Sequence, residues 1–240
     1  MRFRLFFTLE EEHLPQEYRK MFLSFMKKSL TEYENALFFK DFFDGANVKR
    51  YCFSVRLPPC TFEKNYIKLS EKFLTFLVST HDTRTGMILY NAFLTQKLKS
   101  FPLEQKNRMI LTAIRPENHK PISRNKITGK MLMPLCVRFH VKETNEDCYF
   151  THQDENFQEK LRFVLENQVQ TILGIEGSIF EGFSFTPIQM KKTMIRHYGK
   201  MIPVSLGTFE MTGDPLLMNY FFDEGFGSRR SSGFGAFEIF

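Results

Sequence analysis

Near its carboxyl end the chain reads Gly225-Phe226-Gly227-Ser228-Arg229-Arg230-Ser231-Ser232-Gly233-Phe234-Gly235, two Gly-Phe-Gly triplets around a basic spacer. The spacing differs from the Walker loop, because no Gly-Lys-Ser/Thr follows the spacer. It also differs from the dinucleotide fingerprint, whose third glycine would fall at Arg230. Both of those motifs run from a strand to a helix, whereas this loop is expected to run from a helix to a strand. The stretch is therefore a glycine-rich loop of another kind.

The composition of this loop favours an anion as its ligand. Glycine lets the backbone approach a ligand closely and adopt positive φ, so that N–H groups can converge on phosphate oxygens. The paired arginines add bidentate donors, and the serines add small hydroxyl donors. A long flexible turn is the alternative, and the mirrored glycines around paired arginines favour the anion site.

The sequence before the loop predicts a βαββαβ unit. Asp214-Pro215 starts a helix that continues to Glu224, and a last strand is expected over 236–240. The remaining elements are a strand over 130–141, a helix over 156–173 that ends at Gly174, and strands over 184–196 and 201–211 joined by Tyr198-Gly199-Lys200.

The first half predicts the same order of elements, with one short extra strand possible. A strand over 1–9 is followed by a helix from Pro15 to about Leu30, whose apolar residues recur at three- and four-residue steps. After a connector over 38–48 with an Asp44-Gly45 turn, we expect a strand over 49–57, a pair of strands over 66–69 and 73–79, a helix capped by Asp82 or Thr83, and a strand over 109–114. The prediction is an α+β fold of two tandem ferredoxin-like (βαββαβ, RRM-like) domains, 1–118 and 119–240.

The overall composition is that of an ordinary globular protein with a basic surplus. Among 240 residues, 33 Lys and Arg against 27 Asp and Glu give a charge of +6, which permits a polyanionic partner without demonstrating one. No apolar run is long enough to span a membrane, and no secretory signal is visible. The cysteines (52, 60, 136 and 148) show no zinc-ligand spacing, so we expect no metal, reduced thiols and a cytoplasmic location.

The loop makes the sequence resemble a known family. A Gly-hydrophobic-Gly triplet, a basic spacer and a second such triplet before a final strand are similar to the repeat-associated (RAMP) superfamily. Within it, the chain resembles the CRISPR-associated endoribonuclease that cuts precursor CRISPR RNA. The resemblance extends to the Pro15 helix start, to Tyr51-Cys52-Phe53-Ser54, and to the stretches 76–80 and 89–94.

The resemblance implies a metal-independent endoribonuclease without a cofactor. In such RNA scission the 2′-hydroxyl attacks the adjacent phosphorus and leaves a 2′,3′-cyclic phosphate and a 5′-hydroxyl, a reaction that needs a base, an acid and cations. The implied partners are CRISPR repeat RNA, both precursor and mature, and a CRISPR interference complex. We expect a monomer or homodimer without membrane contact.

The catalytic residues of the family are not all present. Its members place a histidine in the connector after the first helix, a tyrosine in that helix and a lysine before the second strand. This chain has no histidine between Pro15 and Ser54. The three positions fall instead on lysines, which gives a hypothetical catalytic set of Lys27, Lys40 and Lys49, with Lys28 and Arg50 in reserve.

A lysine site is chemically possible but needs a perturbed environment. A free lysine, with a pKa of about 10.4, is a poor base at neutral pH, and burial or neighbouring cations can lower that value. A lysine that stays charged can still act as an acid or stabilise the phosphorane. For each lysine singly, a solvated surface position is an equally good interpretation.

RNA contacts are expected in two places. One is the glycine-rich loop, and the other is the basic hairpin before it, where Tyr198 could stack on a base. The expected RNA-binding residues are Lys191, Lys192, Arg196, His197, Gly225, Gly227, Ser228, Arg229, Arg230, Ser231, Gly233 and Gly235. A basic segment with Lys120, Arg124, Lys126 and Lys130 is a further candidate, and solvation explains it equally well.

Two alternatives to the enzyme stay open. The chain could be an RNA-binding subunit of the same family that binds repeat RNA without cutting it, which the missing histidine favours. It could also be an unrelated ferredoxin-like RNA-binding module, but such modules usually show an RNP-type aromatic pattern, which the sequence lacks.

Overall fold

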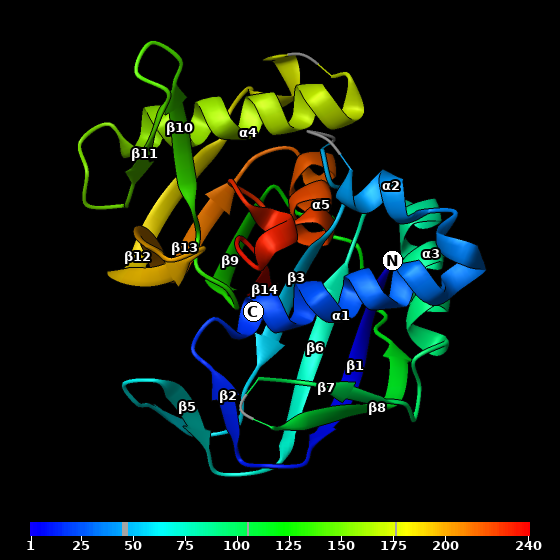
Figure 1. The fold of residues 1–240 in the computed structure, drawn as a ribbon. Helices are drawn as coiled ribbons and strands as arrows, with labels where there is room; N and C mark the ends of the chain where they lie inside the picture. The colour runs from blue at the N-terminus through cyan, green and yellow to red at the C-terminus, as the bar shows by residue number, and fades with distance from the viewer. Residues whose placement is uncertain (45–47, 105, 176) are drawn as a thin grey trace. The chain divides into compact units, whose positions relative to one another are not determined.

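The computed structural model describes residues 1–44, 48–104, 106–175 and 177–240, and it divides into two compact units, Met1–Asn118 and His119–Phe240 (Figure 1). Gly45 of the expected Asp44-Gly45 turn lies outside the described residues. Each unit contains an antiparallel sheet and helices, as expected for an α+β chain of tandem ferredoxin-like folds.

The first unit is built on a five-stranded sheet in the order β3-β6-β1-β8-β7. Its strands are β1 (Arg2–Leu9), β3 (Cys52–Arg56), β6 (Phe73–Ser79), β7 (Ser100–Pro102) and β8 (Arg108–Pro116), and every neighbouring pair is antiparallel. Helix α1 (Tyr18–Glu32) connects β1 to the β3–β6 pair, and α3 (Thr83–Leu94) connects β6 to β8. The order β3-β6-β1-β8 is that of a ferredoxin-like unit, with β7 added at one edge.

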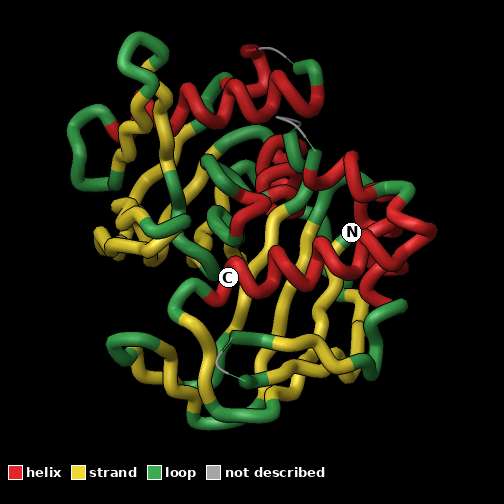
Figure 2. The backbone as a smooth tube through the Cα atoms, viewed as in Figure 1, coloured by secondary structure: helices red, strands yellow, loops and turns green. Residues whose placement is uncertain are grey.

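Phenylalanine fills the core of this unit. Side chains alternate along a strand, so Phe3, Leu5 and Phe7 of β1 point to one face, where none of them is exposed. Helix α1 lies across that face (Figure 2), and its Phe25 contacts Phe7 at 5.1 Å between ring centroids. Phe22 of the same helix packs among the same buried rings.

Three local expectations for this unit are wrong. Pro15 ends the short strand β2 (His13–Pro15), and α1 begins only at Tyr18. The connector over 38–48 contains helix α2 (Phe39–Phe43), and a 3₁₀ turn, η1 (Tyr33–Ala36), comes just before it. Strands β5 (Tyr66–Leu69) and β6 do not pair with each other, because β5 lies between β2 and β4 (Cys60–Phe62) in a second sheet.

The second unit contains a four-stranded sheet in the order β12-β13-β9-β14. Its strands are β9 (Lys126–Met131), β12 (Ser184–His197), β13 (Lys200–Thr212) and β14 (Phe237–Ile239), and its helices are α4 (Phe157–Leu173) and α5 (Pro215–Glu224). Gly174 ends α4 at a φ of 67°, and the Asp214 carboxylate caps α5 by accepting from the Leu216 N–H at 2.7 Å. Short 3₁₀ turns lie at Gly177–Phe180 (η2) and Arg230–Ser232 (η3).

The single strand expected over 130–141 is wrong, and the difference shapes the candidate site. The chain leaves the main sheet after β9 and forms a separate hairpin from β10 (Val137–Val141) and β11 (Glu146–Phe150). This hairpin packs beside α4 (Figure 1). Across the described parts of the chain, no helix is long and apolar enough to cross a membrane, and none of the four cysteines forms a disulfide bond.

Candidate functional site

The glycine-rich loop is closed by its own backbone hydrogen bonds. Phe226 N–H donates to the Gly235 carbonyl at 3.1 Å, and Gly235 N–H donates to the Pro134 carbonyl at 3.0 Å. Ser228 N–H donates to the Cys136 carbonyl at 2.7 Å. These amides are therefore engaged within the unit, and they do not converge on a ligand as the sequence suggested.

The glycines of the loop serve the packing of the protein. A Cβ at Gly235 would come within 2.1 Å of the Phe226 carbonyl oxygen, and one at Gly227 within 2.7 Å of the Cys136 carbonyl oxygen. Both glycines have positive φ, 74° and 91°. The two phenylalanines of the triplets, Phe226 and Phe234, are fully buried. The mirrored triplets thus fasten the loop to the core, which leaves only the spacer at the surface.

Arg230 points into the protein. Its Nη1 donates at 3.0 Å both to Oε2 and to the backbone carbonyl of Glu224, a carboxylate with no exposed surface. A buried charge needs a partner of this kind, because desolvation of an unpaired ion is unfavourable by several kcal/mol. Arg230 was expected to contact RNA together with Arg229; the structure instead pairs it internally.

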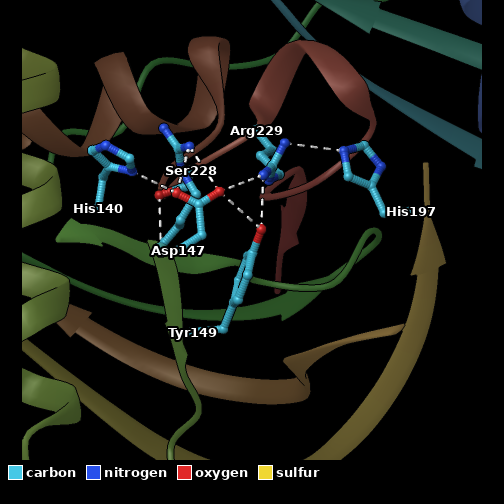
Figure 3. Close-up of polar contacts among 7 residues, drawn as sticks. His140, Asp147, Tyr149, His197, Ser228 and Arg229 are labelled. Atoms are coloured by element: carbon cyan, nitrogen blue, oxygen red, sulfur yellow. Dashed lines mark hydrogen bonds and ion pairs between the residues drawn. The ribbon is translucent and has the colours of Figure 1, made fainter. Parts of the chain in front are cut away.

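Arg229 lies in the part of the spacer that reaches the surface. It belongs to a polar network with residues of the β10–β11 and β12–β13 hairpins (Figure 3). Its Nη2 donates to Oδ2 of Asp147 at 3.1 Å and to the Tyr149 hydroxyl at 2.7 Å. Its Nη1 lies 3.2 Å from Nε2 of His197. The backbone at Arg229 is left-handed, with φ 59°, which turns the side chain toward these partners.

Asp147 is the centre of that network. In addition to the hydrogen bond from Arg229, both of its carboxylate oxygens accept hydrogen bonds from Arg138 Nη1 at 3.1 Å. Its Oδ1 also lies 3.0 Å from Nδ1 of His140. Burial by itself would raise the pKa of Asp147, but the His140 and Arg138 hydrogen bonds and the positive charges of Arg138 and Arg229 lower it below its ordinary value. The carboxylate is thus held charged, and it orients two arginines.

These groups line an open basin with a volume of about 770 Å³. Its lining combines three cations, two acids and several aromatic rings. The lining residues are Arg138, His140, Asn145, Glu146, Asp147, Cys148, Tyr149, His197, Tyr198, Lys200, Ile202 and Arg229. Guanidinium groups and tyrosine rings side by side can hold a phosphate and a base of the same nucleotide. We name this surface the Arg229 basin.

The sequence did not identify the β10–β11 part of the basin. Register pairs His140 with Asp147 and Arg138 with Tyr149 across the two strands. The signal that could have revealed it is the alternation of these polar side chains in two short runs joined by Glu143-Thr144-Asn145. A single strand over 130–141, as the sequence predicts, leaves the second run without a partner strand.

The β12–β13 hairpin presents its basic residues in two ways. Lys191, Lys192 and Arg196 are exposed along β12. His197 is buried instead, with its ring 5.3 Å from that of Phe234 and its Nε2 beside Arg229. Tyr198 is 60% exposed at the hairpin end and, with Lys200, lines the basin. His197 therefore joins the hairpin to the glycine-rich loop.

In the first unit, the three expected catalytic lysines have different environments. Lys49 Nζ is buried and has no hydrogen-bond partner among the described residues. Burial lowers the pKa of Lys49, and the negative charge of Asp44 opposes that shift only in part. Lys27 is exposed on α1, with its Nζ 5.2 Å from the centre of the Phe43 ring, and Lys40 is exposed on α2.

The end of α2 links two of these lysines. Phe43, which contacts Lys27, is followed by Asp44, whose charge acts on Lys49. Phe42 packs against Tyr51 just after Lys49, with ring centroids 6.0 Å apart. The reserve residues are engaged elsewhere: Lys28 pairs with Glu32 at 2.5 Å, and Arg50 lies 3.8 Å from Asp82. No three His, Cys, Asp or Glu side chains in the described ranges gather as a metal site.

Comparison with known families identifies the carboxyl-terminal half. Residues 116–239 match the family model described as "CRISPR associated protein Cas6, C-terminal". The chain belongs to the Cas6 family. The matched region contains the Arg229 basin and the basic hairpin of this Cas6-family chain, whereas its three lysines lie outside that region. No curated protein matches the sequence.

Solved structures share the fold over the whole chain at low sequence identity. The product of a Cas6-related gene from Pyrococcus furiosus is 18% identical, with a TM-score of 0.86 over 100% of this chain and 98% of that one. A RAMP protein described as binding different RNA substrates is 17% identical, with a TM-score of 0.86 over 100% and 99%. A Cas6 product complex is 13% identical, with a TM-score of 0.72 over the full length of both.

Proposed function

We propose that the chain is a metal-independent endoribonuclease that cleaves precursor CRISPR RNA within its repeats. Membership of the Cas6 family supports RNA as the substrate class. The proposed cleavage activity rests on Lys49. Its amine is buried and has no hydrogen-bond partner among the described residues, and its pKa is lowered. A lysine of this kind can be neutral at a lower pH than a surface lysine and can accept a proton.

The proposed reaction uses the lysines in separate roles. Lys49 takes the proton of the 2′-hydroxyl, whose oxygen attacks the adjacent phosphorus. The bond to the 5′-oxygen breaks, and that oxygen takes a proton from a charged lysine, Lys27 or Lys40. The products are a 2′,3′-cyclic phosphate and a 5′-hydroxyl. A charged lysine also offsets the negative charge that develops on the phosphorane.

RNA binding in this proposal rests on the second unit. Lys191, Lys192 and Arg196 follow the phosphate backbone along β12, and the Arg229 basin takes a nucleotide. Ser228 and Ser231, both half-buried in the spacer, stay in the proposed contact set. Arg230 and the four glycines do not, since all five residues are buried within the unit. Cas6 product and substrate-mimic complexes are among the structurally similar chains, which supports this assignment.

The decisive experiment measures single-turnover cleavage of labelled repeat RNA in EDTA, with ribose or deoxyribose at the scissile position. The proposal expects cleavage of the ribose substrate alone and a loss of cleavage in Lys49→Ala. Lys64→Ala, an exposed lysine of the same unit, is the matched control. Cleavage of the deoxy substrate, or an undiminished rate in Lys27→Ala, Lys40→Ala and Lys49→Ala alike, would refute the lysine mechanism.

A second candidate function is an RNA-binding subunit that does not cut. The absence of histidine between Pro15 and Ser54 favours it, because the connector then lacks the family's usual acid-base group. The same experiment separates the two: binding of repeat RNA without products supports the subunit. In either role we propose a cytoplasmic monomer or homodimer that hands mature RNA to a CRISPR interference complex.

A further inference from the structure

The sheet of the first unit has a second face, opposite the buried phenylalanines. Arg4 and Phe6 of β1 point to this face, because they alternate with the buried Phe3, Leu5 and Phe7. On the neighbouring strand β6, Phe73 and Thr75 point the same way: Phe6 is opposite Thr75, and Phe73 is opposite Thr8. Phe6 and Phe73 are therefore diagonal neighbours on two adjacent central strands.

The two rings form an accessible aromatic surface. Their centroids are 6.1 Å apart and their planes are inclined by 31°. Phe73 is 41% exposed, and Phe6 is half-buried. A large apolar ring on an open sheet face is stabilised when a partner covers it.

Arginines surround these rings. The Arg115 guanidinium of β8 lies 5.1 Å from the centre of the Phe6 ring. Arg4 donates to the Thr75 hydroxyl at 3.3 Å, and Arg56, opposite Thr75 at the end of β3, is exposed. A cavity of about 290 Å³ opens between them, and its lining includes Arg4, Phe6, Arg56, Glu71, Phe73 and Thr75.

We infer that this face is a stacking platform for unpaired RNA nucleotides, in which a base stacks on Phe73 and Arg4 and Arg56 contact its phosphates. RNA-recognition sheets stack bases on aromatic side chains of central strands, and arginine supplies the donors for the backbone. The charges fit this ligand: Arg4, Arg56 and Arg115 stand against Glu71 and Glu117, and Glu117 is paired with Arg2 and Arg4. An acidic peptide would satisfy the arginines but would offer Phe73 no obligatory planar group.

This inference rests on the proposed RNA binding and adds a contact surface to it. All of its residues belong to the first unit, and none is among the lysines or the residues of the Arg229 basin. This aromatic pair cannot be seen as a motif in the sequence. Phe6 and Phe73 are far apart in the chain, and only the β1–β6 register brings them together.

The test measures binding of a short unstructured RNA that carries 4-thiouridine, by anisotropy and by photo-crosslinking with peptide mapping. Phe73→Leu keeps the apolar character but removes the aromatic ring, and we expect affinity to fall about tenfold. Phe73→Tyr keeps the ring and should retain the wild-type affinity. Phe62→Leu, a substitution at an exposed phenylalanine of β4 (68% exposed), is the matched control and should change nothing.

Crosslinks are expected on Phe73 or on the strand segments beside it, and they should persist in Lys64→Ala, at an exposed lysine outside the platform. If wild-type protein binds this RNA, with crosslinks confined to the second unit and an unchanged affinity in Phe73→Leu, the platform is refuted while the proposed RNA binding stands. If wild-type protein binds no RNA at all, both proposals fail. A loss in Phe73→Leu that Phe73→Tyr shares equally also overturns stacking.

Discussion

Lys49 in the first unit and Arg229 in the second are both cations beside a carboxylate, but their environments are opposite. Lys49 Nζ is buried without a hydrogen-bond partner among the described residues, whereas Arg229 has Asp147, Tyr149 and His197 around its guanidinium. A poorly compensated amine loses its proton more readily, whereas a compensated guanidinium keeps a fixed charge in a fixed position. The difference is the basis on which we propose proton transfer for the first region and recognition for the second.

The sharpest test of this contrast is Lys49→Arg, which keeps the charge but removes a base. We expect single-turnover cleavage to fall by about 10²- to 10⁴-fold, the usual contribution of a general base. In the wild type the rate should rise with pH and level off below pH 10.5, the ordinary lysine value, because burial lowers the pKa of Lys49.

Lys64→Arg is the control for the same chemical change at an exposed site. An unaltered rate in Lys49→Arg would mean that Lys49 acts only through its charge. The contrast with Arg229 would then disappear.

The next effect concerns the stability of the second unit. Glu224→Ala leaves the buried Arg230 without a carboxylate to balance its charge, and we expect the free energy of unfolding to fall by about 3–5 kcal/mol. Denaturant unfolding measures this. Glu159→Ala, at an exposed carboxylate, should change it by less than about 0.5 kcal/mol.

The double variant Glu224→Ala/Arg230→Met removes both charges. It should recover most of the stability that Glu224→Ala removes, because the desolvated arginine is gone. A double variant as unstable as the single one would show that packing, and not the charge, accounts for the destabilisation.

Asp147 is expected to have a smaller, pH-dependent effect. Its pKa is lower in the folded protein than its ordinary 3.8, so its stabilisation is fully present above pH 3.8 and is lost as the pH falls through the lower folded value. Asp147→Asn should therefore reduce stability at pH 7 by about 0.5–1 kcal/mol, because solvent screens a carboxylate this exposed, and the difference from wild type should shrink in acid. Unfolding curves at several pH values measure it, and a difference that is constant with pH would contradict the assignment.

The smallest effect is expected from the exposed cations of β12. Replacing Lys191, Lys192 and Arg196 by Gln should weaken RNA binding and reduce the slope of log K against log salt by about one for each RNA phosphate that these side chains neutralise. Titrations at several salt concentrations give the slope. Lys64→Gln is the control, and an unchanged slope in the triple variant would remove the hairpin from the RNA path.

Local patterns in the sequence predicted the elements that depend on neighbouring residues. The Asp214-Pro215 helix start, the Gly174 helix end and the hairpin at Tyr198-Gly199-Lys200 all occur as expected, because capping and turn geometry need only a few adjacent residues. The order of strands and helices followed from these elements, and with it the ferredoxin-like fold.

The candidate site could be predicted only in part. The glycine-rich loop was recognised, but the partners of its arginines were not, since Asp147 lies 82 residues from Arg229. The expected pairing of strand β5 with β6 was also wrong. A two-residue periodicity shows that a strand exists, but it does not show which strand lies beside it.

What the sequence alone determined is the order of the strands and helices that make up the two ferredoxin-like units, the basic surplus and the family. Only the tertiary structure decided which charges meet. It buried Arg230 against Glu224, placed Asp147 between Arg138 and Arg229, and left Lys49 without a hydrogen-bond partner among the described residues. The physical reason is that helix caps and turns depend on a few adjacent residues, whereas the solvation and pairing of a charge depend on whatever the folded chain brings beside it.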